Sequence, residues 1–195
     1  MKPIIKVILW CVAIVFIVRG CFMYTEMTHL SQDDLKWVTG YYKDNATFVS
    51  DSGNVSKLTI WGEFVENRTD PFAYTFETGS QYEANAGYEF KITDNLRELD
   101  GLFAIIRKVD SDTLKTFFHF GTRYSNSYEP KIIVESFKIN ETELDSCFII
   151  DSYNSRIPDW SKDTINHINR FVVSKKYGLV YYQLASGEQF YRKFE

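Results

Sequence analysis

Hydrophobic and polar positions divide the chain into two regions with different patterns. Residues 7–18 are twelve apolar residues in a row, whereas beyond residue 45 apolar and polar positions largely alternate. A long uninterrupted apolar run is typical of a helix in apolar surroundings, and a period of two is typical of strands with one buried face. The pattern therefore predicts an apolar N-terminal helix followed by a β-rich body.

The first 24 residues fit a membrane anchor. Lys2 and Lys6 precede the apolar run, and Arg19 follows it. Twelve helical residues rise only about 18 Å, but a helix over residues 4–24 is long enough for a hydrocarbon core of about 30 Å. The basic start favours a cytoplasmic N-terminus and a body outside the cytoplasm. The expected anchor residues are Val7, Ile8, Leu9, Trp10, Val12, Ile14, Val15, Phe16, Ile17 and Val18.

The same segment also fits a secretory leader, with a basic start and a short apolar centre. Val18, Gly20 and Cys21 match a bacterial lipobox, whereas Arg19 departs from it because that position is normally small or apolar. Cleavage after residue 20 would leave Cys21 as a lipid attachment site, and an ordinary cleaved signal is a third alternative. All three place the body beyond the cytoplasmic membrane. Residues 25–30 are then a tether, and residues 31–195 a single domain.

The body is expected to begin with a short helix over residues 31–38. Ser31 is a favourable N-cap, and Asp33 and Asp34 place negative charge in the first turn, where the helix dipole favours it. Residues 67–87 read as a loop with one edge strand, Asp100 and Gly101 as a turn, and residues 161–168 as one or two helical turns. Strands are expected at residues 46–49, 56–65, 88–93, 102–109, 113–120, 131–139, 147–151, 170–174, 179–184 and 189–194.

Turn signals recur about every 8 to 12 residues, which favours an antiparallel sandwich or a curved, barrel-like sheet over a βαβ fold. The composition agrees, because 16 Phe, 13 Tyr and 4 Trp suit the half-buried surface of a sheet. A body of this length can bury a core without disulfides or metals. The predicted fold class is thus mainly β, with one short helix before the sheet and the anchor helix before that.

Two stretches resemble small, uncharacterised envelope proteins of the Bacteroidota. The first is LSQDDLKW at residues 30–37, followed by Tyr41, Tyr42 and the pair Thr47 and Phe48. The second is the closing segment, residues 171–182 with residues 187–190 after it. The resemblance covers only these stretches, and it implies a secreted, anchored, all-β body. It supplies no functional residues.

The charged and reactive residues indicate no recognisable chemistry. The net charge is −4 and basic residues are scattered, so nucleic acid is not an expected partner. Three cysteines do not form a disulfide framework, and Cys147 lies in an apolar run typical of a buried position. His29, His119 and His167 lack metal-ligand spacing. We therefore expect no enzyme, no metal and no cofactor.

The acidic groups occur at helix starts and turns, where carboxylates are common as caps. They are Asp33 with Asp34, Asp110 with Asp112, and Glu141 with Glu143 and Asp145.

Function is left to three hypotheses. The first is a non-catalytic interaction module that presents a sheet face or edge to another envelope component. The second is a lipocalin-like carrier of an apolar small molecule, and the third, the weakest, is an envelope hydrolase. The first is motivated by the anchor, the short tether and the absence of a catalytic set, and the second by the aromatic strands. The aromatic residues that could line a barrel mouth or an exposed binding face are Trp61, Tyr74, Tyr88, Phe90, Phe118, Phe120, Tyr181 and Phe190.

Overall fold

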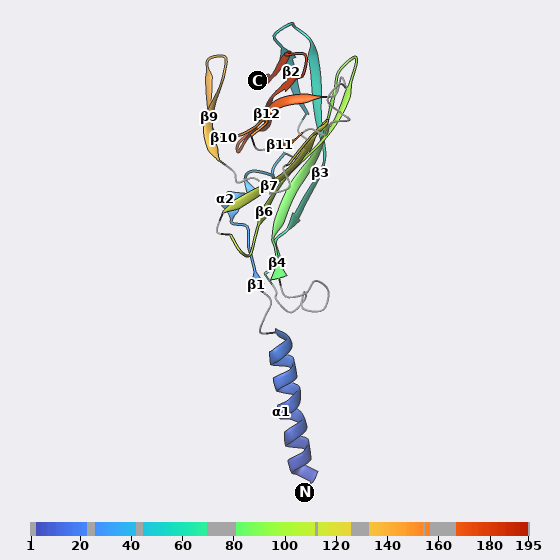
Figure 1. Cartoon of the computed structure of the whole chain (residues 1–195), viewed down its shortest axis with the longest axis vertical. Helices are drawn as coiled ribbons and strands as arrows, with labels where there is room; N and C mark the ends of the chain where they lie inside the picture. The colour runs from blue at the N-terminus through green and yellow to red at the C-terminus, as the bar shows by residue number, and fades with distance from the viewer. Residues whose placement is uncertain are drawn as a thin grey trace.

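The computed structural model describes residues 3–22, 26–41, 45–69, 81–111, 113–125, 133–153, 155–156 and 167–194. The first element, α1 (Pro3–Phe22), is a helix that extends away from the β-rich body in Figure 1. Within the described ranges, no helix combines the length and apolarity needed to cross a membrane. Membrane attachment through residues 1–24 therefore stays a prediction.

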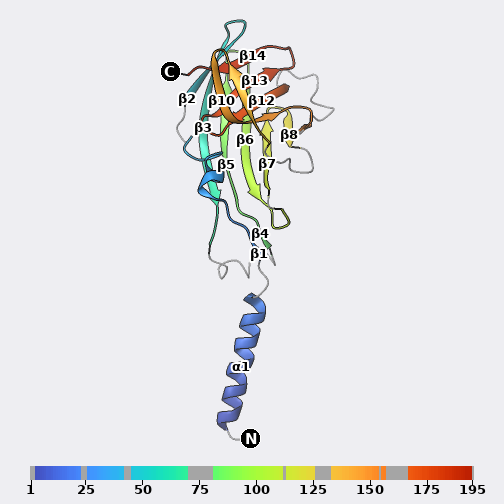
Figure 2. The ribbon, with the colours of Figure 1, turned by 90° about the vertical axis from the view of Figure 1, so that its left-hand side faces the viewer.

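The body is built on one curled antiparallel sheet, which confirms the mainly β expectation. Of the two expected shapes, the sheet adopts the curved one and closes into a half-barrel (Figures 1 and 2). Its described strands follow the order β11-β8-β7-β6-β5-β3-β2-β14-β13-β12-β10-β9. They are β2 (Asn45–Ser50), β3 (Val55–Glu66), β5 (Asn85–Thr93), β6 (Glu98–Arg107), β7 (Leu114–Phe120), β8 (Arg123–Ser125), β9 (Val134–Ile139), β10 (Thr142–Ile150), β11 (Ser155–Arg156), β12 (Ile168–Ser174), β13 (Gly178–Leu184) and β14 (Gln189–Arg192).

The segment before the sheet packs against the body. Strand β1 (Glu26–Met27) lies in the segment expected to be a tether, and it pairs in parallel with β4 (Gln81–Tyr82). Helix α2 (Gln32–Leu35) follows, with the predicted cap at Ser31. The Ser31 hydroxyl accepts a hydrogen bond from the Asp34 amide at 3.0 Å, and the Asp34 carboxylate accepts one from the Ser31 amide at 2.8 Å. This capping box starts the helix, because it satisfies backbone donors that have no partner within the helix.

Aromatic rings fill the concave side of the sheet. The largest fully buried side chains are Tyr88, Tyr182, Phe48, Phe90, Phe103, Phe118, Phe120, Phe148, Phe171, Phe190, Leu58 and Ile92. Phe118 of β7 and Phe171 of β12 meet edge to face with ring centroids 5.3 Å apart, although six strands separate β7 and β12 in the sheet. The sheet therefore curls until distant strands face each other across one shared aromatic core.

Arg123 adds a polar link across the same gap. This β8 side chain is 3% exposed, and its Nε donates a hydrogen bond to the Ile168 carbonyl of β12 at 2.6 Å. Its Nη1 also donates to the Ser155 hydroxyl of β11. Burial lowers the pKa of the Arg123 guanidinium to about 10, and the charge of Asp151 acts in the opposite direction. Arg123 thus ties the β8 and β11 end of the sheet to β12.

The expected turn at Asp100 and Gly101 is wrong, because both residues lie inside the long strand β6. Gly101 pairs with Phe90 of β5. A Cβ atom at Gly101 would lie 2.1 Å from the Phe90 ring. The glycine therefore makes room for a core ring instead of making a turn.

Other element boundaries also shift. Strand β5 begins at Asn85, three residues earlier than expected, and β10 begins at Thr142, five residues earlier. The hairpin of β6 and β7 and the closing meander of β12, β13 and β14 are confirmed. Most of the loop expected at residues 67–87, and most of the segment expected to form helical turns at residues 161–168, lie outside the described residues. At the end of that segment, Ile168 begins β12 instead of lying in a helical turn.

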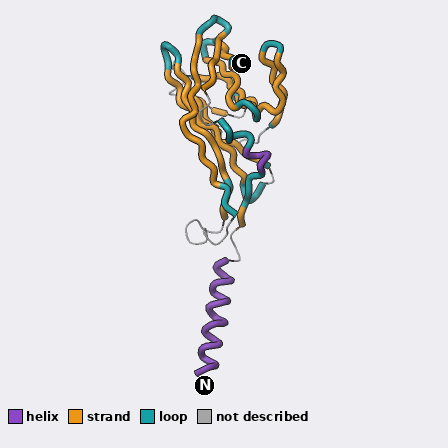
Figure 3. The backbone as a smooth tube through the Cα atoms, turned by 180° about the vertical axis from the view of Figure 1, so that it is seen from behind, coloured by secondary structure: helices purple, strands orange, loops and turns teal. Residues whose placement is uncertain are grey.

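The hairpin of β9 and β10 folds over the outer face of the last strands. The pairing of β10 shifts register between Leu144 and Cys147, and Ser146 there has a φ of 56°. This bulge turns the β9 half of the hairpin away from the main sheet, as Figures 1 and 3 show. A second core lies beneath it, formed by Ile139, Leu144, Cys147, Val172, Val180 and Tyr181. Cys147 is fully buried, as expected from its sequence surroundings.

Candidate functional site

Most of the aromatic residues expected at a binding face lie in the two cores instead. The buried ones are Tyr88, Phe90, Phe118, Phe120, Tyr181 and Phe190. Trp61 is 58% exposed, and Tyr74 lies outside the described residues. Aromatic residues at alternate positions of a strand share one face. That face points into the curl for these residues except Tyr181, which belongs to the second core under the β9–β10 hairpin.

The structure places a different apolar surface on the outer side of the sheet. Strand registers align Leu102 of β6 with His119 of β7, and His119 with Tyr124 of β8. The His119 and Tyr124 rings stack with centroids 4.7 Å apart. Phe117, two residues before His119 on the same face, is 43% exposed. We call this surface the outer aromatic face, defined by Trp61, Phe64, Leu102, Phe117, His119 and Tyr124.

Small residues lie in the middle of the outer aromatic face. Gly87 lies between Phe64 of β3 and Ala104 of β6 in the strand register. A Cβ atom at Gly87 would lie 2.6 Å from the Phe64 ring, so this ring lies directly over the glycine. Ala104 is aligned with Phe117. Small residues thus let large rings lie close to the sheet in this part of the face. Glu89 is aligned between Gly62 and Leu102, so the face also carries a carboxylate.

Most of this face was not predicted from the sequence, because the predicted aromatic residues lie mostly on the buried side of their strands. His119 faces away from Phe118 and Phe120, whose rings are fully buried. The same alternation puts Phe117 and Leu102 on the outer side. In β6 and β7, Leu102 and Phe117 occupy outer positions that are usually polar when a sheet face is exposed to water. These two apolar residues were the sequence signal for the outer aromatic face.

A second candidate is an open cleft of about 920 Å³ that we call the charged cleft. Three segments and Arg192 line it. The segments are residues 33–41, which include the end of α2, residues 142–146 of β10, and residues 174–177 at the turn from β12 to β13. The Tyr41 hydroxyl holds two of these segments together, since it donates toward the Lys36 and Lys175 carbonyls at 2.9 and 2.6 Å.

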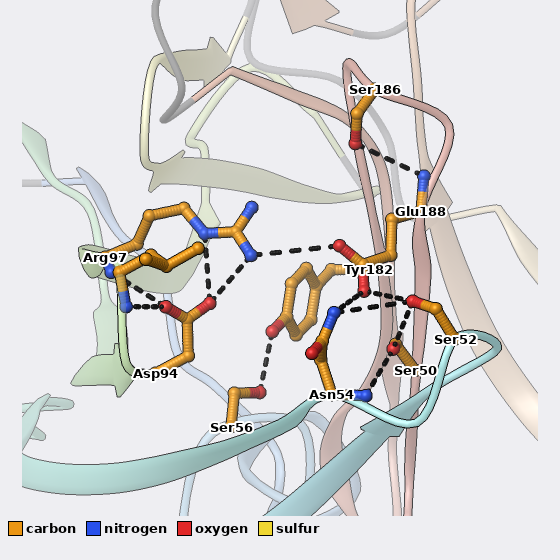
Figure 4. A network of polar contacts seen from close by, with 10 residues as sticks. Ser50, Ser52, Asn54, Ser56, Asp94, Arg97, Tyr182, Ser186 and Glu188 are labelled. Atoms are coloured by element: carbon orange, nitrogen blue, oxygen red, sulfur yellow. Dashed lines mark hydrogen bonds and ion pairs between the residues drawn. The ribbon is translucent and has the colours of Figure 1, made fainter.

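A polar network ties three turns at the far end of β13, as Figure 4 shows. Arg97 contacts the Asp94 carboxylate through Nε at 2.9 Å and Nη2 at 2.8 Å, and its Nη2 lies 3.9 Å from Glu188 Oε2. Glu188 Oε1 accepts hydrogen bonds from the Ser52 hydroxyl and the Asn54 amide, both at 2.7 Å. We call these five residues the turn clasp.

The turn clasp is a structural element rather than a reactive one. Burial raises the pKa of Glu188, but hydrogen bonds from Ser52, Asn54 and Ser50 and the charge of Arg97 outweigh it, so the pKa lies below its ordinary value. Nearby, burial raises the pKa of Tyr182, whose hydroxyl is 2.7 Å from that of Ser56. The carboxylate and the phenol are therefore both held in their ordinary ionisation states.

The expected membrane-anchor residues lie on α1, and the described His, Cys, Asp and Glu residues form no metal-binding group. The described side chains of the expected anchor are exposed: Val7, Ile8, Leu9, Trp10, Val12, Ile14, Val15 and Ile17. The side chains of Phe16, Val18 and Cys21 lie outside the described residues. Among the residues that the structure describes, no group of three or more His, Cys, Asp or Glu residues could hold a metal ion.

Comparison of the chain with protein-family models, with curated proteins and with solved structures finds no significant match. The arguments for function therefore depend on the residues themselves.

Proposed function

We propose that the protein is a non-catalytic interaction module of the cell envelope, which binds a partner protein through the outer aromatic face while its N-terminal segment attaches it to a membrane. One observation carries the docking part. Trp61 and Phe117 are 58% and 43% exposed on the outer side of the sheet, which also holds Leu102 and the stacked pair of His119 and Tyr124. Aromatic anchors are among the groups that contribute most to protein interfaces.

The contrast between the two halves of the outer sheet surface supports docking. Over β12 to β14, the hairpin of β9 and β10 covers the apolar side chains and forms the second core. Over β3 to β8, the exposed rings lie on the same outer surface without a comparable hairpin among the described residues. A partner protein would remove these rings from water, at about 25 cal/mol for each Å² of apolar surface.

The curled sheet is also compatible with a carrier of an apolar ligand. However, a carrier needs an interior cavity, and the described aromatic side chains occupy the concave side of this sheet. This packing favours the interaction module, with the apolar surface on the outside.

Membrane attachment is supported by the apolar composition of residues 7–18 and by the exposure of their described side chains. A lipid bilayer would cover these side chains, and lipid on Cys21 is the alternative form of attachment. Intact-mass measurement of the membrane-extracted protein separates the two. A full-length mass indicates an anchor helix, and a chain that begins at Cys21 with added acyl mass indicates a lipoprotein. A full-length product recovered from the cytosol contradicts both.

Site-specific photocrosslinking in the source cells tests the docking part. A photoreactive phenylalanine at position 117 should give a discrete crosslinked product, because the ring would lie inside the interface. The same probe at Tyr153, which is 93% exposed in a turn after β10, is the matched control and should not give it. Trp61→Ala should reduce the product at position 117. Equal crosslinking at both positions, or none at position 117, contradicts docking on this face.

A further inference from the structure

The charged cleft shares no lining residue with the outer aromatic face, and its lining contains charged residues of both signs. Glu143 and Asp145 come from β10, and we call them the acidic side. Lys175, Lys176 and Arg192 are the basic side. The volume of about 920 Å³ falls within the range of small-molecule sites in proteins.

The cations of the basic side are held in place by neighbouring groups. Lys175 Nζ lies 2.6 Å from the Asp33 carboxylate and 5.7 Å from the centre of the Trp37 ring. Lys176 Nζ lies 4.8 Å from the centre of the Tyr177 ring. Arg192 Nη1 donates a hydrogen bond to the Tyr177 carbonyl at 2.6 Å. A ligand would therefore meet a prearranged positive surface, and less side-chain entropy would be lost on binding.

Asp33 does not cancel this positive surface. It is shared between Lys175 and Lys36, whose Nζ is 3.3 Å from its second oxygen. Two lysines thus offset one carboxylate, and Lys176 contributes further positive charge. Lys176 forms no salt bridge with any residue that the structure describes.

The acidic residues Glu143 and Asp145 form no salt bridge within the described part of the chain. Lys138 of β9 lies opposite Glu143 in the strand register. Asp145 precedes Ser146, whose φ of 56° marks the bulge where β10 leaves the main sheet. The Lys175 amide donates to the Ser146 carbonyl at 2.9 Å, which fixes this bulge against the basic side. The distance between the two sides is therefore set by the fold.

Charged residues of both signs in one lining favour a ligand that carries both charges. A purely anionic ligand would be repelled by Glu143 and Asp145, and a purely cationic one by Lys175, Lys176 and Arg192. Between the two sides, Tyr41 and Tyr177 add ring surface to the lining. We propose that the charged cleft binds a short zwitterionic peptide, with its carboxylate on the Lys176 and Arg192 side and its ammonium on the Asp145 side.

Calorimetry on the full-length protein in detergent tests this assignment, with trialanine that has both ends free as the probe. Binding is expected with a Kd at or below about 1 mM. N-acetyl-trialanine and trialanine amide each lack one charge and should bind about tenfold more weakly or not at all. Absence of trialanine binding, or equal binding of all three peptides, overturns the proposal.

Variants locate the site. Asp145→Asn and Lys176→Gln should each weaken trialanine binding about tenfold. Glu135→Gln is the matched control, since this residue lies on β9 of the same hairpin and outside the cleft lining. It should leave binding unchanged, and far-UV circular dichroism should be the same for all three variants. Loss of binding in the control, or unchanged binding in Asp145→Asn and Lys176→Gln, overturns the assignment to this cleft.

Glycerophosphoethanolamine, a zwitterion with the charges of a lipid headgroup, is the competing ligand. Weaker binding than trialanine is expected, and tighter binding overturns the peptide assignment. Trp61→Ala should leave trialanine binding unchanged, so the outcome is independent of docking on the outer aromatic face.

Discussion

At the scale of single residues, the packing of the sheet depends on glycines, whose lack of a Cβ atom leaves space for neighbouring rings. Gly101 leaves space on the concave side for the Phe90 ring, and Gly87 leaves space on the outer side for the Phe64 ring. Gly62 differs, because a Cβ atom there would meet its nearest neighbour, Glu89 Oε2, at an ordinary contact distance of 3.6 Å. Two of these three glycines are thus required by rings that pack directly against them.

Gly101→Ala should therefore destabilise the protein by about 1 to 3 kcal/mol, because the new methyl group would displace the Phe90 ring in a filled core. Gly62→Ala is the matched control, also in a strand, and should change the stability by no more than about 0.5 kcal/mol. Urea denaturation followed by tryptophan fluorescence measures both. Equal midpoints for the two variants would contradict this account of Gly101.

At the scale of elements, three hairpin turns are held together by the turn clasp. The β2–β3 turn supplies Ser52 and Asn54, the β5–β6 turn supplies Asp94 and Arg97, and the β13–β14 turn leads to Glu188. Arg97 and Asp94 have side chains only 12% and 8% exposed. Their interaction is screened less by water than that of a surface pair.

The stabilisation by Glu188 should depend on pH. Its pKa in the folded protein lies below the ordinary 4.5, so the stabilisation is present above pH 4.5 and is lost as the pH falls through the folded pKa. Glu188→Gln should cost about 1 kcal/mol at pH 7 and progressively less below pH 4.5. Thermal denaturation from pH 7 to pH 3 measures this.

The control is Glu98→Gln, which removes an exposed partner of Lys91 and should cost no more than about 0.5 kcal/mol. A cost for Glu188→Gln that stays constant as the pH falls would contradict the assigned role of its carboxylate.

At the scale of the whole molecule, the curl of the sheet brings distant strands into one core. The ring contacts of Phe171 with Phe118 and Phe120 join β12 to β7, and Arg123 joins β8 to β12. The outer surface is then divided between a half covered by the β9–β10 hairpin and a half that carries the outer aromatic face.

Arg123→Ala should loosen the β8 and β11 end of the sheet first. The variant removes hydrogen bonds from a buried guanidinium to Ile168 and Ser155, so amide hydrogen exchange in β8 and β11 should accelerate about tenfold or more. Exchange in β13 should change less, because the Arg123 hydrogen bonds reach β11 and β12 and not β13. Arg156→Ala, an exposed arginine on β11, is the control. Uniform acceleration across all strands would show that Arg123 supports the whole fold instead.

The sequence by itself determined the class of the fold and many of its elements. Alternation of period two predicted the β6–β7 hairpin and the closing meander, because each strand must bury one face. Ser31 with Asp34 predicted the start of α2, because capping is a local interaction. The apolar run at Cys147 predicted a buried thiol for the same local reason.

Only the tertiary structure decided which face of each strand packs into the core and how far the sheet curls. It also decided where the outer aromatic face and the charged cleft lie. The same alternation fits either face, and the Asp100 and Gly101 pair reads locally as a turn until Phe90 from the next strand occupies the space above the glycine. The outer aromatic face joins strands from residue 61 to residue 124, and the charged cleft joins residues from α2 to Arg192. Such sites depend on contacts between residues far apart in the chain, which local patterns do not encode.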